Sequence, residues 1–332
     1  MPMSPLSPKI AIIILNWNGK RDSADCLESL TQLDYPHADI ILVDNGSSDG
    51  SIPYLREHFP AIHYVELPHN LGFAGGNNAG IKYALTLGSD LFLLLNNDTV
   101  ISPDFLTHFV RAFHSHPQVG ILGASIYLFD QRDTLDHLGG MWNKKAANVD
   151  LIGFREKRLS EGPCIPLDYV CGACMIFTKA VLDAIGFLEE NYFLYWEEND
   201  YCLQAKKAGF GVMHCPQAKI WHKVSASVVG GKPHANYFWW RGRLLWISRH
   251  YTRREKFFLY LRVILPAFYK LYKINALKSL QLSFLKLLRN QASWEKKAAK
   301  LQSTKASLAG VRDYFCKQYG PGPSWIYKPP KR

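Results

Sequence analysis

Two short polar clusters in this 332-residue chain follow apolar runs and carry carboxylates able to bind a nucleotide or a metal ion. The first begins at Asp44 and Asn45, directly after the apolar run 39–43. A carboxylate there can accept a hydrogen bond from a ribose hydroxyl or from the imide N–H of a pyrimidine. An ordinary Asx turn followed by a helix N-cap uses the same residue types, and the cluster alone favours that simpler role.

The second cluster is Asn96-Asn97-Asp98, which follows the apolar run LFLLL. An acidic residue at the end of a buried strand suits Mg²⁺ or Mn²⁺, because these hard cations prefer oxygen ligands and take further ones from nucleotide phosphates. A strand-terminating turn explains the triplet equally well. His222, in KIWHKVSAS, becomes a candidate ligand only if the fold brings it beside Asp98, since a lone histidine is more often structural.

A third group places Glu197, Glu198 and Asp200 just before a predicted helix. Carboxylates this close raise the pKa of at least one of them unless they share a cation or a proton, and a raised pKa suits a general base. Acidic residues also stabilise helix N-termini without any catalytic role. The aromatic residues between 192 and 196 suit a sugar-binding wall as well as an ordinary core.

A glycine- and asparagine-rich segment that opens another predicted helix is a weaker signal for phosphate binding. Glycines let the backbone approach a phosphate, and a helix N-terminus favours an anion. The spacing matches neither GxGxxG nor GxxxxGK[ST], so neither a dinucleotide fingerprint nor a P-loop is present. The residues concerned are Asn70, Gly72, Gly75, Gly76, Asn77, Asn78 and Gly80.

Alternating strands and helices are predicted to position these groups. Such alternation indicates an α/β fold with a mostly parallel sheet, helices on both faces and ligands outside the carboxyl ends of the strands. Apolar runs predict strands at 9–15, 39–43, 63–67 and 91–95, and helical spacing predicts helices at 21–33, 51–58 and 102–114. Farther along we predict hairpins and loops at 130–166, a strand at 168–177, helices at 179–186 and 199–209, and a strand pair at 211–222.

Charge divides the chain into two parts. Residues 1–231 hold 17 Lys and Arg against 25 Asp and Glu, residues 232–332 hold 22 against 3, and the net charge is +11. We therefore predict one domain at 1–231 and a basic, aromatic, helical region at 232–332. The length and the 48% hydrophobic content exclude a chain that is disordered throughout.

The seven cysteines are too few, and odd in number, for a disulfide scaffold, which indicates a reducing compartment. Cys171-x-x-Cys174 is a weak redox or zinc signal without a second pair, and its apolar setting favours buried packing. The N-terminal residues do not predict a signal peptide, because one Lys precedes an apolar run that Asn16 ends early.

Seven segments carry a family resemblance: IILNWNG (13–19), ILVDNGSSDGS (41–51), NLGFAGGNNAGI (70–81), LLLNNDT (93–99), GACMIF (172–177), GFLEENYFLYWEENDYCLQAKKAG (186–209) and IWH (220–222). In this order they resemble the inverting glycosyltransferases of family 2, which have the GT-A fold, and most closely the rhamnosyltransferase-like branch. The resemblance covers roughly residues 9–250. No single segment is specific, whereas the ordered set is.

The resemblance implies a donor site for a nucleotide-sugar. Asn16 and Asp44 would hold the base and ribose, with Asn45 beside them. A loop at 72–78 would border the diphosphate, and its donor-binding residues would include Gly75 and Asn78.

The resemblance also implies a metal site and a catalytic base. The triplet that ends in Asn97 and Asp98 occupies the family's DXD position, so Asp98 would be the main carboxylate on Mg²⁺ or Mn²⁺ and Asn97 a donor contact. His222 matches a histidine that completes the metal site in related enzymes. Glu198 stands where the family places its catalytic base, with Asp200 as a second catalytic carboxylate.

The implied enzyme is a hexosyltransferase of polysaccharide biosynthesis in the cell envelope. It would move a sugar from a nucleotide-sugar to a hydroxyl of a glycan or lipid-linked acceptor in one metal-assisted displacement, with dTDP-rhamnose suggested as the donor. Two alternatives stay open: a sugar-1-phosphate nucleotidyltransferase, and an inactive nucleotide-sugar or glycan-binding protein.

The basic region requires a partner of opposite charge. Its aromatic and arginine residues in 237–260 could stack on bases, but no known nucleic-acid motif is present and the rest of the chain is acidic, so we predict no nucleic-acid partner. An anionic membrane surface fits better, because the apolar run 257–272 is too short and too charged to span a bilayer but can lie in its interface. A solvated basic face is the simpler alternative. The predicted location is cytoplasmic, peripheral at the inner face of the cell membrane.

Overall fold

The computed structural model describes residues 7–157, 161–223, 233–287 and 291–328. The chain forms two compact units. The sheet unit consists of Met1–Trp142, Val149–Glu189 and Glu198–Val224, and the helical unit of Asn143–Asn148, Glu190–Glu197 and Ser225–Arg332. The boundary expected between residues 231 and 232 lies outside the described residues.

The sheet unit alternates strands and helices in its first half, as the apolar runs predict. Its first elements are β1 (Ile10–Asn16), α1 (Lys20–Leu30), β2 (Ala38–Asp44), α2 (Ser51–His58), β3 (His63–Glu66), α3 (Gly72–Thr86), β4 (Leu91–Asn96), β5 (Thr99–Ile101) and α4 (Phe105–Ser115). Then follow β6 (Val119–Leu128), β7 (Gln131–His137), β8 (Gly139–Asn143), β9 (Asn148–Ile152), β10 (Ile165–Pro166), β11 (Cys174–Thr178), α5 (Lys179–Ile185), α6 (Glu197–Lys207) and β12 (Gly211–His222).

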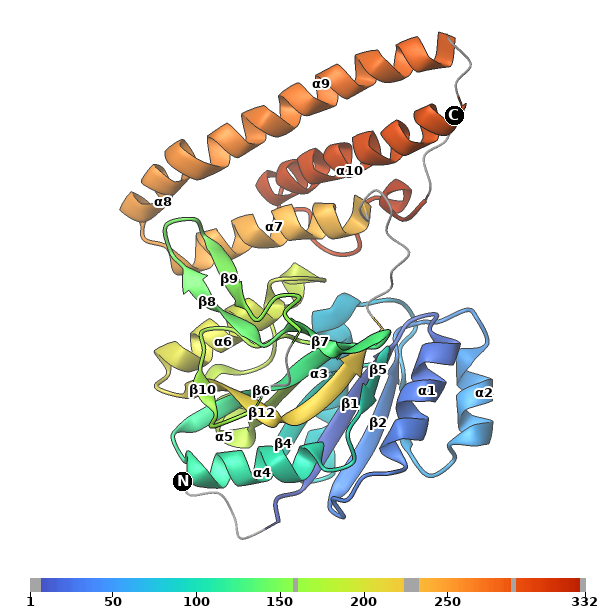
Figure 1. The fold of residues 1–332 in the computed structure, drawn as a ribbon, viewed down its shortest axis with the longest axis vertical. Coiled ribbons are helices and arrows are strands. Elements are labelled where there is room, and N and C mark those ends of the chain that lie inside the picture. The colour runs from blue at the N-terminus through green and yellow to red at the C-terminus, as the bar shows by residue number, and fades with distance from the viewer. Residues whose placement is uncertain (1–6, 158–160, 224–232, 288–290, 329–332) are drawn as a thin grey trace. The chain divides into compact units, whose positions relative to one another are not determined.

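The main sheet has the order β10-β12-β6-β11-β4-β1-β2-β3, with β5 beside β12 and β7 beside β6. β4, β1, β2 and β3 run parallel, as do β6 and β12, while β11 is antiparallel to both of its neighbours. Figure 1 shows helices covering both faces of this sheet. The predicted α/β class with a mostly parallel sheet is therefore confirmed.

Alternate residues of β1 supply two separate cores. Ile10, Ile12 and Ile14 face one side and pack in a cluster with residues of α1 and α4. Ala11 and Ile13 face the other side and pack with residues of α3, α5 and α6. Because successive side chains of a strand point to opposite faces, a fully apolar strand requires helices on both sides.

The glycine-rich segment is helical, which corrects the prediction of a loop at 72–78. α3 begins at Gly72, so Gly75 and Asn78 lie inside the helix. A Cβ added at Gly76 would stand 2.4 Å from Leu15 Cδ1, and one at Gly80 would stand 2.4 Å from Ile13 Cγ2. Glycine at 76 and 80 thus allows α3 to approach the sheet closely.

Three further expectations need correction. The segment 211–222 is a single strand, β12, with an irregularity between Cys215 and Lys219, where a strand pair was predicted. The strand predicted at 168–177 begins only at Cys174. Glu197 and Glu198 lie within the first turn of α6, whereas the helix predicted at 199–209 begins after them.

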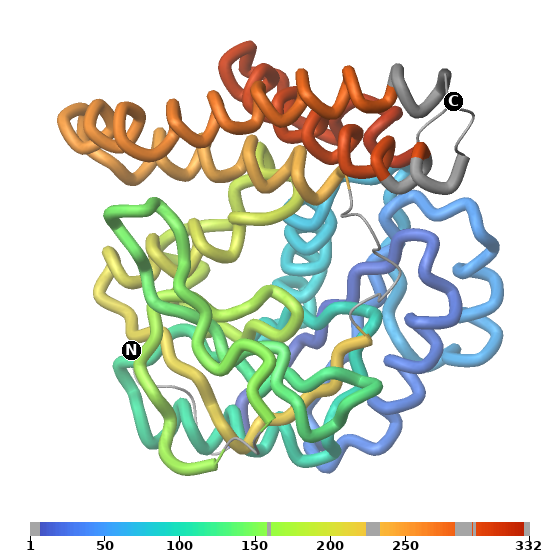
Figure 2. The backbone as a smooth tube through the Cα atoms, turned by 45° about the horizontal axis from the view of Figure 1, so that its top comes forward, coloured from blue at the N-terminus to red at the C-terminus, as the bar shows by residue number. Residues whose placement is uncertain are grey.

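The helical unit is built from α7 (Pro233–His250), α8 (Arg253–Leu259), the π-helical turn η2 (Tyr260–Ile264), α9 (Leu265–Leu287) and α10 (Gln291–Phe315). Two short 3-10 turns, η1 (Glu190–Tyr192) and η3 (Ser324–Tyr327), belong to it as well. α10 packs against both α7 and α9, and Figure 2 shows these helices side by side. None of the helices among the described residues is long and apolar enough to cross a membrane.

Part of the basic, aromatic run 237–260 is buried. Arg241 is 1% exposed and donates to the carbonyl oxygens of Gly320 at 2.8 Å and Tyr192 at 3.3 Å. Arg243 donates to the carbonyl oxygens of Ala147 at 2.9 Å and Ala146 at 2.5 Å. Both guanidinium groups fix the backbone of the helical unit.

The substitution Gly80→Ala tests the close packing of α3. The added methyl group would collide with Ile13 and with Val43, whose Cγ2 lies 2.9 Å from the Cβ position. Overpacking of this kind should lower the free energy of unfolding by about 1–3 kcal/mol, measured by denaturant titration. Thr86→Ala, on an exposed position of the same helix, should change it by less than about 0.5 kcal/mol. Equal effects of the two substitutions would contradict the packing role.

Candidate active site

The amide of Asn16, the last residue of β1, is the centre of a polar network at the carboxyl edge of the sheet. Asn16 is 0% exposed. Its Nδ2 lies 2.9 Å from Asp44 Oδ1, 3.1 Å from Ser47 Oγ and 2.9 Å from Ser51 Oγ, so two N–H groups serve three acceptors. Its Oδ1 accepts from Ser23 Oγ at 2.8 Å. Asn16 therefore connects β1 to the ends of β2, α1 and α2.

The network extends to the end of β4. Asn97 Nδ2 donates to Ser23 Oγ at 2.9 Å, and Ser23 in turn donates to Asn16. Asn97 is thus joined to Asn16 and Asp44 through Ser23, a residue that the sequence analysis did not identify.

Asp44 and Asn45 each have a defined setting. Asp44 Oδ2 accepts from the backbone N–H of Ser47 at 3.0 Å, as in an Asx turn. Asn45 Nδ2 donates to the carbonyl oxygen of Gly72 at 3.0 Å, and its Oδ1 accepts from the N–H of Leu71 at 2.8 Å. Asn45 therefore holds the turn that precedes α3. The donor-binding roles of Asn16, Asp44 and Asn45 stay predictions.

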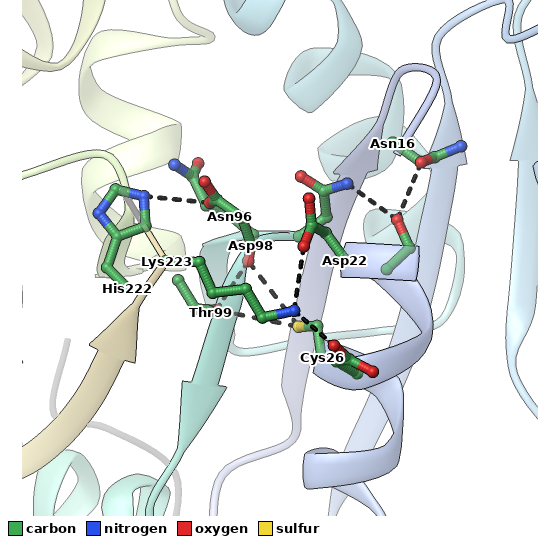
Figure 3. Close-up of polar contacts among 11 residues, drawn as sticks. Asn16, Asp22, Cys26, Asn96, Asp98, Thr99, His222 and Lys223 are labelled. Atoms are coloured by element: carbon green, nitrogen blue, oxygen red, sulfur yellow. Dashed lines mark hydrogen bonds and ion pairs between the residues drawn. The ribbon is translucent and has the colours of Figure 1, made fainter. Parts of the chain in front are cut away.

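Asp98 and His222 lie side by side, although they come from distant parts of the chain. His222 Nε2 is 3.0 Å from Asp98 Oδ1, and Figure 3 shows the two side chains facing each other. The pairing of β5 with β12, in which Thr99 stands opposite His222, brings them together. The N–H of Lys223 also donates to the backbone oxygen of Asp98 at 2.8 Å.

Asp136 lies beside Asp98 and His222 as a third polar residue, and no sequence motif predicted it. Its Oδ2 lies 3.8 Å from His222 Nδ1, and its Oδ1 lies 3.3 Å from Arg155 Nη2. Burial alone would lower the pKa of His222, but the contacts to Asp136 and Asp98 raise it to about 10. Two carboxylates thus stabilise the protonated imidazolium, and a cation bound here by His222 would displace that proton.

The residues present fit a divalent cation that is completed by a substrate. Asp98 offers a carboxylate oxygen and His222 a ring nitrogen at one point of the sheet edge. Within the described residues, no group of three or more His, Cys, Asp or Glu is arranged to hold a metal ion alone. Mg²⁺ ordinarily takes one or two protein carboxylates and fills the remaining positions with water and phosphate oxygens.

Glu198 lies in a buried setting that sequence patterns did not reveal. Tyr169 donates its hydroxyl to Glu198 Oε1 at 3.4 Å, and His137 stacks on Tyr169 with ring centroids 6.2 Å apart. Burial lowers the pKa of His137, which also interacts electrostatically with Asp136, His222 and Glu198. His137 is therefore within electrostatic range of both Glu198 and His222.

Other predicted site residues are held by their own neighbours. Asp200 is 0% exposed, and its Oδ2 accepts from Gln204 Nε2 at 2.6 Å. Asn78 is 1% exposed and both donates to and accepts from the backbone of Leu188, at 2.9 and 3.0 Å. This geometry gives both side chains structural tasks, and their catalytic and donor-binding roles stay predictions.

The cysteines are free thiols rather than a disulfide framework. Burial raises the pKa of Cys171 to about 11 and also raises that of Cys174. A thiol that holds its proton is a poor nucleophile and a poor metal ligand, so these values support the packing role for the CxxC pair.

The fold is that of an α/β protein with polar side chains at the carboxyl edge of its sheet, and comparison with known families identifies its class. Residues 11–186 match the family model described as glycosyl transferase family 2. The chain belongs to this family and is a glycosyltransferase.

Two curated glycosyltransferases are similar to this chain in sequence. Over 213 residues the chain is 27% identical to the low-salt glycan biosynthesis hexosyltransferase Agl10 of Haloferax volcanii, a match covering 62% of this chain and 64% of that protein. Over 247 residues it is 23% identical to the N-acetylglucosaminyl-diphospho-decaprenol L-rhamnosyltransferase of Mycobacterium tuberculosis, covering 63% of this chain and 79% of that protein.

Solved structures confirm the fold. The mannosyltransferase PcManGT from Pyrobaculum calidifontis, in complex with GDP-Man and Mn²⁺, superimposes with a TM-score of 0.58 at 14% identity, covering 96% of this chain and 90% of that one. A structure of S. aureus TarS 1-349 gives 0.52 at 15% identity, covering 94% and 92%. The resemblance to family 2 glycosyltransferases of the GT-A fold is therefore confirmed.

The substitution Asn16→Asp tests the central amide. It removes two N–H donors and sets a carboxylate 2.9 Å from that of Asp44 in a fully buried site. The free energy of unfolding should fall by about 3 kcal/mol, because an uncompensated buried charge is created. Asn18→Asp makes the same change at an exposed position where only the side-chain oxygen is used, by the N–H of Ser48 at 2.8 Å. Denaturant titration should find that control nearly unchanged, and similar losses for both would argue against a central role for Asn16.

Proposed function

We propose that this chain transfers a sugar from a nucleotide-sugar to a hydroxyl group of a glycan or lipid-linked acceptor, with inversion at the anomeric carbon. The observation that carries the proposal is the 3.0 Å contact of His222 Nε2 with Asp98 Oδ1 at the carboxyl edge of the sheet. In a chain of family 2, a carboxylate and an imidazole at that point support a cation site for a nucleotide-sugar. Residues 1–231 would form the catalytic domain.

Glu198 is the residue we assign as general base. Its carboxylate removes the proton from the acceptor hydroxyl, whose oxygen then attacks the anomeric carbon opposite the nucleoside diphosphate. Tyr169, which donates to Glu198 Oε1 at 3.4 Å, would hold the carboxylate in position. One displacement of this kind inverts the configuration of the sugar.

Asp98 and His222 are the residues that would hold the divalent cation. A bound Mg²⁺ or Mn²⁺ would supply positive charge to the departing diphosphate. Mn²⁺ in the structure of PcManGT supports this class of cation. Asp44, fixed by Asn16, would bind the ribose or base of the donor through its carboxylate.

The donor and acceptor classes follow from the relatives. Names such as N-acetylglucosaminyl-diphospho-decaprenol L-rhamnosyltransferase and the dTDP-rhamnosyl transferase RfbF of Shigella flexneri support dTDP-rhamnose as donor and a lipid-linked glycan as acceptor. We further propose a peripheral location at the inner face of the cell membrane, where such an acceptor resides.

Glu198→Gln should reduce sugar transfer at least about 100-fold, because a positioned general base contributes that much or more to the rate. Binding of the nucleoside diphosphate should persist, because the amide keeps the size of the side chain. The measurement is release of nucleoside diphosphate from a panel of nucleotide-sugars with Mg²⁺ or Mn²⁺, together with calorimetric binding. Near-normal turnover would remove Glu198 from the role.

Asp183→Asn is the control, since Asp183 is also acidic but lies exposed on α5, where it pairs with Lys179 at 2.7 Å. It should leave turnover nearly unchanged, because no predicted site residue lies at that position. Pyrophosphate release from a nucleoside triphosphate and a sugar phosphate would identify a nucleotidyltransferase instead. Binding of nucleotide-sugars without any turnover across acceptors would identify an inactive binding protein.

A further inference from the structure

An exposed apolar stripe runs along α9 and the turn before it. Leu261, Leu265, Tyr269, Tyr272 and Leu280 are 54%, 54%, 67%, 62% and 70% exposed. Their separations of four, four, three and eight residues keep them on one face of a helix with 3.6 residues per turn. Large side chains this exposed and this regularly spaced form a continuous apolar surface, which is uncommon on a protein facing only water.

The opposite face of the same helix already has its packing partner. Leu282 is 9% exposed and clusters with Trp294, Ala298 and Leu301 of α10. Half-buried and buried residues of α9 alternate with the solvent-exposed ones, as expected for a helix that packs against α10 on one side. The stripe is therefore not needed to hold the helical unit together.

Positive charge flanks the stripe. Arg262, Lys270 and Lys273 are exposed, and the sequence from 256 to 287 contains six Lys and Arg but no Asp or Glu. The acidic residue nearest to this segment in sequence, Glu255, lies 2.6 Å from Lys144 in an ion pair. Apolar side chains beside unopposed basic ones are the pattern of a helix lying in a membrane interface.

We propose that the outer face of α9, with η2 before it, docks on an anionic lipid bilayer and lies in its plane. Leu261, Leu265 and Leu280 enter the acyl boundary, and the two tyrosines sit at the headgroup level. The flanking basic residues reach lipid phosphates, each contributing through electrostatic attraction. The stripe is thus the membrane-binding surface of the helical unit.

A second copy of this chain is a less suitable occupant. A two-fold contact would place the same surface of each copy against the other. Arg262, Lys270 and Lys273 would then face their own counterparts, and like charges across a contact repel. An anionic bilayer instead supplies charge of opposite sign along the whole helix.

This inference rests on the peripheral location proposed above, but binding to lipid requires neither donor nor acceptor. The experiment is sedimentation of the full chain with vesicles of phosphatidylcholine, or of phosphatidylcholine mixed with phosphatidylglycerol. Strong binding to the mixed vesicles and weak binding to the neutral ones is expected. Loss of transferase activity leaves this readout unchanged, so failures of the two proposals can be told apart.

Two variants separate the apolar and charged contributions. Leu265→Ser with Tyr269→Ser and Tyr272→Ser should weaken binding to the mixed vesicles by more than about 100-fold, because three large apolar contacts are lost. Arg262→Gln with Lys270→Gln and Lys273→Gln should weaken it by about 100-fold, at about fivefold per charge. The second set should also remove the preference for anionic over neutral vesicles.

The matched control changes exposed apolar residues in the β8–β9 hairpin and directly after it. Met141, Leu151 and Phe154 are 44%, 42% and 56% exposed, and their replacement by serine should leave vesicle binding as in the natural chain. Circular dichroism verifies that each variant is folded. If the triple serine variant does not fold, Tyr269→Glu alone takes its place and should weaken binding about tenfold or more.

Three results would overturn the proposal. The first is equal partitioning of the natural chain to neutral and anionic vesicles. The second is binding by the folded stripe variants as strong as that of the natural chain. The third is a dimer in lipid-free solution, seen by analytical ultracentrifugation, that the stripe variants abolish, because a second copy of the chain would then be the occupant.

Discussion

The buried amide of Asn16 is the interaction on which the polar edge of the sheet depends. An amide both donates and accepts, so one side chain can bind the Asp44 carboxylate through Nδ2 and the Ser23 hydroxyl through Oδ1. A carboxylate at this position would lack the donors, and an apolar residue would leave Asp44 and Ser23 without this partner. Because Ser23 also accepts from Asn97, the ends of β1, β2 and β4 are fixed relative to one another.

The contact between Asp98 and His222 depends on a different constraint, namely the pairing of β12 with strands that come much earlier in the chain. β12 pairs in parallel with β6 and antiparallel with β5, so its last residue, His222, lies opposite Thr99 and beside Asp98, the second residue after β4. The ion pairs of Lys223 with Asp22 at 3.0 Å and Asp25 at 2.5 Å tie the same strand end to α1. Local turns thus determine the positions of Asn16, Asp44 and Asn45. Strand pairing between distant segments determines the Asp98–His222 contact.

The contrast explains what the sequence could predict. Strands and helices of the first half, and the polar residues at their ends, follow from local apolar periodicity. Asp136, Tyr169 and His137 could not be found this way, because their role depends on contacts to His222 and Glu198 made by distant segments. Family resemblance supplied Glu198 and His222 as candidates but gave no account of the residues that hold them.

The glycines of α3 show a second limit. A glycine lets a helix approach a sheet closely, and it also lets a backbone approach a phosphate closely, because it has no Cβ. Both roles therefore produce the same glycine-rich pattern in a sequence. Gly76 and Gly80 serve the first role, since a Cβ at either would collide with β1 side chains. The predicted loop was wrong for this reason, while the helix that follows it was correctly expected.

The basic third of the chain carries two kinds of positive charge that composition cannot separate. Arg241 and Arg243 are buried and bind backbone carbonyl oxygens, so they act as structural cross-links of the helical unit. Arg262, Lys270 and Lys273 are exposed beside an apolar stripe and have no acidic residue near them in sequence. Only the second kind is available to a partner. Net charge therefore overstates the attraction to an anionic surface, and the distribution along α9 determines where that attraction acts.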